Sequence, residues 1–449
     1  MLTIFNMRRI FFAIAVLLTA AAASAQTKTV TLSGKLINFS NQVEVEDMSE
    51  FQYLDIPSSD RLIIPDSTGK FNITFALSAP NYFRVGRNIL YLSPGDKMEV
   101  VIDKNDPNKG SFTGKGAAAN NYLRGTPFPK GGSFLEASKN LMPTPKETLT
   151  ALITMAGLRQ KQLDEVTGVS PEFKRLESAR VKADLLCSIN AVNSYAPGSK
   201  KIGDQKEYMK TFAQLAAETK AKNEQNFIDA SLMKMVVYRD VAEDMISSAP
   251  VTADSKKIKD FYLATDITNR MVRENDKAKL AGYRKSIDSI GTLSYRQAVT
   301  KHLNNLMAFG KGDVAVDFTG IDLNGKKVSL SQLKGKVIYV DLWATWCGPC
   351  LAEMPKLEEI KAKYRDNPNV VFLSVSIDDD NQIDRWKQNV AQRKANGYQW
   401  QIDRNKLAQY NVTTIPRTLL IDKNFKVVSM SAPLPSAKNL GSELDKLLN

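Results

Sequence analysis

Two cysteines separated by two residues are the groups in this chain best suited to chemistry. Cys347 and Cys350 end the segment Trp343-Ala-Thr-Trp-Cys-Gly-Pro-Cys350, and Cys187 is the only other cysteine among 449 residues. Thiols at this spacing can exchange with a disulfide through thiolate attack, a mixed disulfide and its resolution by the second thiol. The pair therefore predicts thiol-disulfide exchange.

A bare Cys-x-x-Cys pair also occurs in zinc sites, but tetrahedral coordination needs two further ligands. The other cysteine and histidine residues that could serve as zinc ligands are Cys187 and the single histidine, His302, and both lie in segments with helical patterns. Cys187 lies in an apolar stretch and is expected to be a buried, inert thiol. His302 is expected on an exposed helix face. On this ligand count no metal site is predicted, and no cofactor is expected.

The sequence around the cysteines supplies the helix N-terminus that a reactive thiolate needs. Residues 336–342 form a nearly continuous apolar run, as expected of a central strand covered on both faces. The following helix starts at Cys347, where free backbone N–H groups and the helix dipole favour the anion. Gly348 and Pro349 allow a tight turn into the helix, and Cys350 lies one turn further on.

The alternation of strands and helices continues to the C-terminus and indicates an α/β domain over residues 312–449. The patterns predict a second apolar strand at 369–377, a helix at 384–395, a hairpin from 418–422 and 426–429, and a closing helix at 439–448.

The upstream sequence has two other patterns, so the fold class is multidomain. Residues 26–125 contain short alternating segments separated by turns such as Ser93-Pro-Gly-Asp96, and they predict an all-β, sandwich-like domain. Residues 126–311 predict an α-helical region, with helix-start signals at Thr144-Pro145 and Ser170-Pro171. Long helices are expected near 172–195, 205–247, 254–275 and 293–308.

The N-terminus has the pattern of a secretory signal. Arg8 and Arg9 precede an apolar run over residues 10–18, and Ala23-Ser-Ala25 fits a cleavage site. We therefore expect residues 1–25 to be a signal peptide and the protein to be exported to the periplasm. The alternative is an uncleaved segment that tethers the protein, although the run is shorter than the about 20 residues of a membrane span.

The basic character of the chain does not indicate a nucleic-acid partner. The formal net charge is +13, yet from Asp313 onward there are 19 basic and 16 acidic residues. Most of the excess therefore lies upstream of the cysteine pair, and no nucleic-acid-binding motif accompanies it.

The segment Val340-Asp-Leu-Trp-Ala-Thr-Trp-Cys-Gly-Pro-Cys350 resembles the active-site strand and loop of thioredoxin, and more closely the TlpA/ResA class of exported thioredoxin-like proteins. The resemblance implies that Asp341 is a buried aspartate that accepts the proton of Cys350. It also implies that Glu353 tunes the cysteine pair, although an exposed helix residue is an equal alternative. Pro416, after Thr414-Ile415, falls at the cis-proline that faces the cysteines.

The resemblance covers residues 313–449 and implies a thioredoxin-like fold there. Residues 27–125 resemble, more weakly, a β domain of undefined role that is often fused ahead of such folds in secreted bacterial proteins. Trp343 is expected to pack in the core. The substrate-binding residues implied by the resemblance, with Trp346 partly exposed, are Trp346, Gly348, Pro349, Ile415 and Pro416.

These observations predict an exported thiol-disulfide oxidoreductase that acts mainly as a reductant of client proteins. A membrane electron donor would have to reduce it again, because the periplasm is oxidising. The alternative is a client-binding or scaffold protein of the cell envelope, in which the upstream domains recruit clients or form a homo-oligomer. A peroxidase is disfavoured, since the sequence has no peroxidase-type Pro/Thr/Cys loop.

Overall fold

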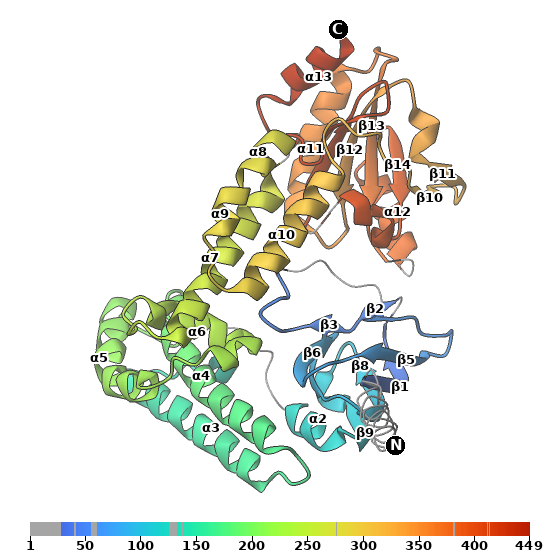
Figure 1. Cartoon of the computed structure of the whole chain (residues 1–449). Coiled ribbons are helices and arrows are strands. Elements are labelled where there is room, and N and C mark those ends of the chain that lie inside the picture. Colours follow the sequence, from blue (N-terminus) through green and yellow to red (C-terminus); the bar gives the residue numbers. More distant parts are fainter. Residues whose placement is uncertain are drawn as a thin grey trace, which may run out of the picture.

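The structure is a computed structural model, and it shows the three predicted parts: a sheet-rich N-terminal domain, a helical middle and a C-terminal α/β domain (Figure 1). The predicted signal peptide over residues 1–25 lies outside the described residues. No helix within the described part of the chain has the length and apolarity to cross a membrane. The described residues are 28–39, 42–54, 61–124, 133–136, 138–274, 276–379, 382–410, 412 and 414–449.

The main sheet of the β domain has the strand order β5-β1-β8-β9. Its strands are β1 (Thr29–Ile37), β5 (Lys70–Ala76), β8 (Lys97–Asp103) and β9 (Ser111–Lys115). β1 runs antiparallel to β5 and parallel to β8. Along β1, Val30 and Leu32 are buried while Thr29 is exposed. This alternation sends one face of the sheet into a core, as the period-two direction of strand side chains requires.

Two smaller sheets and a helix complete this domain. The strands are β3 (Glu46–Asp47), β6 (Asn81–Val85) and β7 (Asn88–Leu92) in one sheet, and β2 (Val43–Glu44) with β4 (Leu62–Ile63) in the other. A 3-10 turn spans Pro107–Lys109, and α2 (Ala117–Leu123) packs on β7 and β9. In α2, the buried Asn120 side chain accepts a hydrogen bond from the Tyr91 N–H (2.8 Å) and donates one to the Tyr91 carbonyl (3.0 Å). It thereby satisfies backbone groups of the edge strand β7.

The helical region begins with strongly capped helices, as the sequence predicts. Thr144 and Glu147 form a reciprocal capping box at the start of α3, and the Ser170 side chain accepts a hydrogen bond from the Phe173 N–H at the start of α4. The helices are α3 (Pro145–Glu165), α4 (Pro171–Tyr195), α5 (Gln205–Glu224), α6 (Val236–Ile246), α7 (Ala253–Arg273), α8 (Lys277–Gly282), α9 (Arg284–Asp288) and α10 (Leu293–Ala308), with 3-10 turns at η3 (Ser133–Leu135) and η4 (Ala230–Lys234).

Two expectations for this region are wrong. The single helical segment at 205–247 is broken between α5 and α6, because Asn226 has a positive φ of 53° and Asp229 caps η4 instead of continuing the helix. His302 is buried, since it lies on the face of α10 that packs against the core rather than on the exposed face. The expected burial of Cys187 is confirmed, because it lies buried within α4.

The β domain and the helical region share one hydrophobic core. Tyr82 of β6 crosses this boundary, and its hydroxyl donates a hydrogen bond to Glu177 of α4 at 2.6 Å. Glu177 also accepts a hydrogen bond from the Arg180 Nε at 3.0 Å, and all three residues are buried. The ion pair lies within α4 and neutralises the buried Glu177 carboxylate, while the hydrogen bond from Tyr82 joins the β domain to this helix.

The C-terminal domain is a seven-stranded mixed sheet of order β11-β10-β14-β13-β12-β15-β16. Its strands are β10 (Thr319–Asp322), β11 (Lys327–Ser329), β12 (Val337–Trp343), β13 (Val370–Ser376), β14 (Tyr398–Gln401), β15 (Arg417–Ile421) and β16 (Val427–Ser429). The predicted strands and the 418–429 hairpin are confirmed, whereas β14 was not predicted. Helices α11 (Gly348–Lys363), α12 (Ile383–Gln392) and α13 (Leu440–Leu448) pack on the sheet, with 3-10 turns at Leu330–Leu333 and Arg404–Tyr410.

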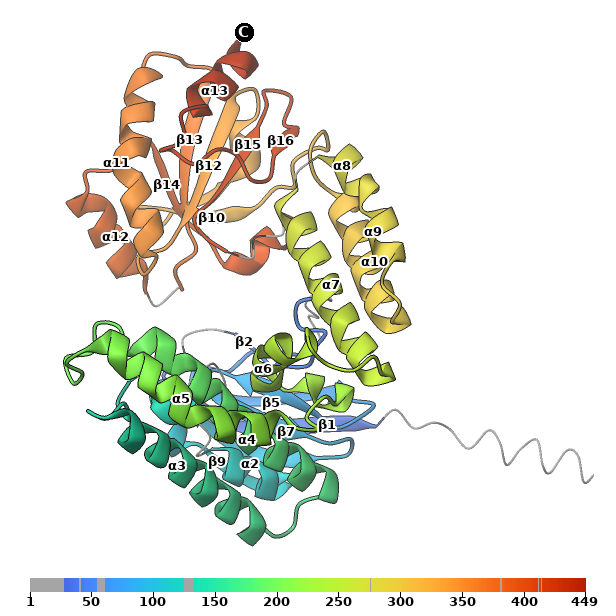
Figure 2. The same ribbon diagram turned by 90° about the vertical axis from the view of Figure 1, so that its left-hand side faces the viewer.

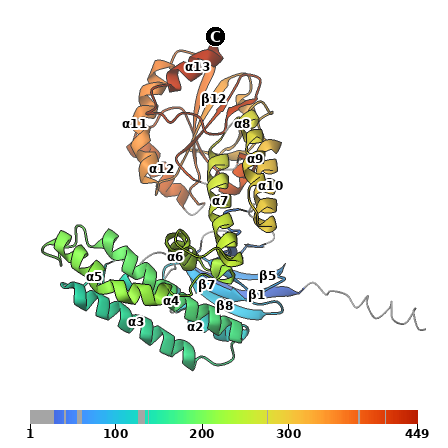
Figure 3. The same ribbon diagram turned by 60° about the vertical axis from the view of Figure 1, so that its left-hand side comes forward.

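Helices α11 and α13 cover the face of β12 that carries Val337 and Tyr339. Helices α7 and α10 extend from the middle of the chain to this domain and run alongside it (Figures 2 and 3). An ion pair between Lys277 of α8 and Asp313 joins this helical segment to the domain, as does a ring contact between Phe309, the C-cap of α10, and Tyr410. The β domain lies below the C-terminal domain in Figure 1 and faces it.

Candidate active site

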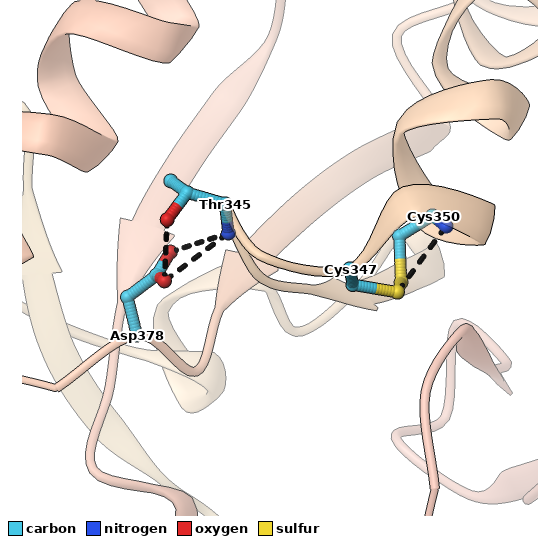
Figure 4. Close-up of a disulfide and its surroundings, with 4 residues drawn as sticks. All are labelled: Thr345, Cys347, Cys350 and Asp378. Atoms are coloured by element: carbon cyan, nitrogen blue, oxygen red, sulfur yellow. Dashed lines mark hydrogen bonds between the residues drawn. A yellow bond between two sulfur atoms is a disulfide. The ribbon is translucent and has the colours of Figure 1, made fainter. Parts of the chain in front are cut away.

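The cysteine pair lies where a buried strand becomes a helix. β12 ends at Trp343, and Cys347 is the N-cap of α11, with Pro349 in the first helical turn. Cys347 and Cys350 form a disulfide with their Cα atoms 5.3 Å apart (Figure 4). The Cys347 Sγ accepts a hydrogen bond from the Cys350 N–H at 3.2 Å. The helix N-terminus thus directs an N–H group at the sulfur, which favours its thiolate after reduction.

The disulfide is shielded, whereas the loop around it is open. Cys347 and Cys350 expose only 5% and 2% of their surfaces, but Trp346 exposes 57%. Gly348 and Pro349 are exposed as well. These three residues therefore form exposed surface next to the cysteines in the chain. Trp343, in contrast, is buried beneath the loop, as expected.

The predicted proline loop lies at the same end of β12. The Ile415–Pro416 peptide bond is cis. β15 begins directly after it, and Arg417 pairs with Leu342 near the end of β12. Ile415 also packs against the hydrophobic cluster that contains both cysteines. The structure therefore brings this loop and the Cys-x-x-Cys segment, which are far apart in sequence, to one edge of the sheet.

Asp341 is a buried acid on β12, on the same face as Val337 and Tyr339. Burial raises the pKa of Asp341 from 3.8 to about 7, the nearby Lys361 lowers it, and Glu353 raises it further. Lys361 and Glu353 both belong to α11, so the carboxyl lies on the side of β12 that is covered by the cysteine-bearing helix. A carboxyl with a pKa near neutrality can take up and release a proton under ordinary conditions.

Glu353 does not contact the cysteines directly. It is half-buried, and its carboxylate accepts hydrogen bonds from the Ser436 N–H (2.9 Å) and hydroxyl (2.8 Å). These bonds join α11 to the loop before α13. Glu353 is therefore not a fully exposed helix residue, and its negative charge contributes to the raised pKa of Asp341.

A further carboxylate, Asp378, holds the loop that leads to Cys347, and the sequence reasoning missed it. It accepts hydrogen bonds from the Thr345 N–H (2.9 Å) and the Thr345 hydroxyl (2.8 Å) (Figure 4). It also accepts one from the Ser376 hydroxyl (2.7 Å). The Gln401 side chain donates to the Asp378 carbonyl at 2.7 Å. Polar residues just past a buried parallel strand, next to the strand that enters the site, were the available signal.

Comparison with known proteins places this site in a described family. The Redoxin family profile matches residues 310–445. Thiol-disulfide oxidoreductase ResA of Bacillus anthracis is 32% identical over 138 residues, which are 30% of this chain and 78% of that protein. The thioredoxin-like protein YneN of Bacillus subtilis is 30% identical over 136 residues, 30% of this chain and 79% of that protein.

Among solved structures, the thioredoxin domain of a thiol-disulfide oxidoreductase from Bacteroides vulgatus is 28% identical, with a TM-score of 0.29, and the match covers 31% of this chain and 99% of that one. The Redoxin match includes both cysteines, Asp341, Asp378 and the proline loop. The chain is an enzyme that belongs, through its C-terminal domain, to the thiol-disulfide oxidoreductases of the Redoxin family.

Proposed function

We propose that this oxidoreductase is exported and reduces the disulfides of client proteins. The observation that carries the proposal is the position of Cys347 at the N-terminus of α11, with an N–H group directed at its sulfur. The Cys347 thiolate attacks one client sulfur, forms a mixed disulfide and displaces the other sulfur as a thiolate. Cys350 then attacks the Cys347 sulfur. The client leaves as a dithiol with two electrons, and the enzyme is left with the Cys347–Cys350 disulfide.

Asp341 is the proton acceptor in this scheme. Cys350 must lose its proton before it attacks, and Asp341 is a buried carboxyl beneath the same helix with a pKa raised to about 7. An acceptor with a pKa near the working pH is an effective general base. Glu353 and Lys361 act on the cysteines through the pKa of Asp341.

The exposed rim of the site contacts the client. Trp346, Gly348 and Pro349 form the open surface beside the disulfide, and Ile415 and Pro416 lie at the same edge of the sheet. A client backbone that passes between these two segments brings its disulfide to Cys347. The signal-like residues 1–25 support the proposed export, and in an oxidising compartment the enzyme needs a membrane electron donor to reduce it again.

The test is the reduction of a protein disulfide by the full chain and by cysteine variants. Cys347→Ser should abolish reduction, and Cys350→Ser should accumulate mixed disulfides with clients, which can be isolated and identified. Cys187→Ser is the matched control, because this third cysteine is buried in α4, and it should behave as wild type. If Cys347→Ser retained the full activity, the envelope scaffold alternative would replace the proposal.

The redox direction has its own measurement, the equilibrium potential against glutathione. Thioredoxin, a reductant, has a potential of about −270 mV, and the strong oxidant DsbA about −120 mV. A value near the first supports a reductant, and a value near the second would reverse the proposed flow of electrons.

A further inference from the structure

A cleft of about 1040 Å³ lies between the active-site edge of the C-terminal domain and the β domain. On the C-terminal side it is lined by Trp346 and by residues 377–379 and 403–405. On the opposite side it is lined by residues 35–39 and 64–69 of the β domain, which faces this edge in Figure 1. Small-molecule pockets enclose about 300–1,000 Å³, so this cleft is at the upper end of that range and is open as well. It has room for a segment of polypeptide.

Each wall of the cleft presents one large, exposed hydrophobic side chain. Ile64 exposes 72% of its surface on the β-domain wall, and Trp346 exposes 57% beside Cys347. A single exposed apolar residue needs no explanation. Here, however, two such residues from separate domains line one cleft, and one of them directly precedes Cys347. An apolar side chain that enters the cleft can be covered from both sides.

The backbone on both sides of Ile64 is fixed by a buried strand residue and by a hydrogen-bonded turn. Ile63, just before it, is buried and ends β4. After it, the Asp66 carboxylate accepts hydrogen bonds from the Thr68 and Lys70 N–H groups at 2.8 and 2.9 Å. A rigid wall loses little conformational freedom when a ligand binds, which favours binding.

The charges on the two walls are mixed. Lys35 and Lys104 are exposed on the β-domain side, while Asp403 and Arg404 are exposed on the C-terminal side. A site for a phosphate or another small anion would gather charges of one sign. Mixed charge around two apolar side chains suits an extended polypeptide, which presents polar backbone groups and side chains of both kinds.

We propose that the β domain is the second wall of the client site: an extended segment of a disulfide-bearing polypeptide lies in this cleft, with an apolar side chain against Ile64, while its disulfide reaches Cys347. This inference rests on the proposed function and adds no new chemistry to it. It assigns to the β domain a role in selecting clients.

The test compares Ile64→Ser with wild type in the reduced, full-length protein. The second-order rate constant is measured with two oxidants: a peptide that carries a disulfide loop with an isoleucine nearby, and the small Ellman's disulfide reagent. We expect about a ten-fold loss with the peptide, in keeping with the loss of one partly buried isoleucine contact, and no change with the small reagent. Val251→Ser is the matched control, because Val251 is 75% exposed but does not line the cleft.

The outcomes separate the two proposals. An Ile64→Ser rate equal to that of Val251→Ser with the peptide would overturn the role of the β domain and leave the proposed function standing. Equal slowing with both oxidants would also overturn it, because the change would then act on the cysteines themselves. A wild type that fails to react with the small reagent would refute the proposed function, and with it this inference.

Discussion

Replacing Asp341 with asparagine should stabilise the C-terminal domain at neutral and alkaline pH. Burial raises the pKa of Asp341 from 3.8 to about 7 in the folded protein, whereas an aspartate in an unfolded chain ionises near about 3.9. Between these values the unfolded chain has lost the proton that the folded protein keeps. A rise in pH through this window therefore favours the unfolded state, and stability falls until the folded carboxyl also ionises near pH 7.

The size of the effect follows from the two pKa values. A difference of about three units corresponds to about 4 kcal/mol, at about 1.36 kcal/mol per unit. This group alone should therefore lower the free energy of unfolding of the wild type by about 4 kcal/mol between about pH 4 and pH 8. Asparagine does not ionise, so the free energy of unfolding of Asp341→Asn should not show this decrease. The excess of its unfolding free energy over that of the wild type should reach its full size at about pH 8.

The chain offers a domain-specific probe for this measurement. All four tryptophans belong to the C-terminal domain, namely Trp343, Trp346, Trp386 and Trp400. Tryptophan fluorescence during urea denaturation therefore follows the unfolding of this domain within the full-length protein. The measurement uses the oxidised protein, because disulfide-bonded cysteines do not titrate and so add no pH dependence of their own.

Two further variants make the result specific. Asp366→Asn changes an exposed aspartate of the same domain, and its pH profile should follow that of the wild type. Glu353→Gln removes the negative charge that raises the pKa of Asp341, so the decrease in stability with pH should become smaller. The reasoning would be refuted if Asp341→Asn and wild type kept a constant difference in unfolding free energy from about pH 4 to pH 8.

Two other substitutions test contacts away from the sulfurs. Asp378→Ala removes the acceptor that holds the loop before Cys347, so it should lower the free energy of unfolding, measured by fluorescence, by about 2–3 kcal/mol. It should also slow disulfide exchange. An unchanged exchange rate would show that the loop keeps its position without Asp378. Glu177→Ala removes the carboxylate to which the buried Arg180 donates, so it should cost about 3–5 kcal/mol in the unfolding of the β-helical part, measured by circular dichroism. A shift of the tryptophan transition to the same extent would contradict that assignment to the upstream core.

Much of the local structure was predictable, because its causes lie within a few residues. The apolar run before the cysteines became the buried strand β12, and Thr144 and Ser170 became helix caps. These features depend on side-chain polarity and on hydrogen bonds between near neighbours. The position of Cys347 at the start of α11 followed from the same kind of signal.

The errors fall where a distant segment decides the outcome. β14 is short and contains the polar residues Gln399 and Gln401, so its pattern alone is not that of a buried strand. It becomes one because those residues pair with Ser374 and Ser376 of β13. His302 was placed on the wrong side of its helix for a related reason, since only the packing of α10 decides which face is covered.

By itself, the sequence determined the cysteine pair, the helix start at Cys347 and the order of three structurally distinct regions, since each is a property of neighbouring residues. The tertiary structure alone decided the raised pKa of Asp341, the hydrogen bonds from Thr345 to Asp378 and the cleft between the C-terminal domain and the β domain. Each of these depends on which distant groups exclude water from, or donate hydrogen bonds to, a given atom. That information arises only when the chain packs.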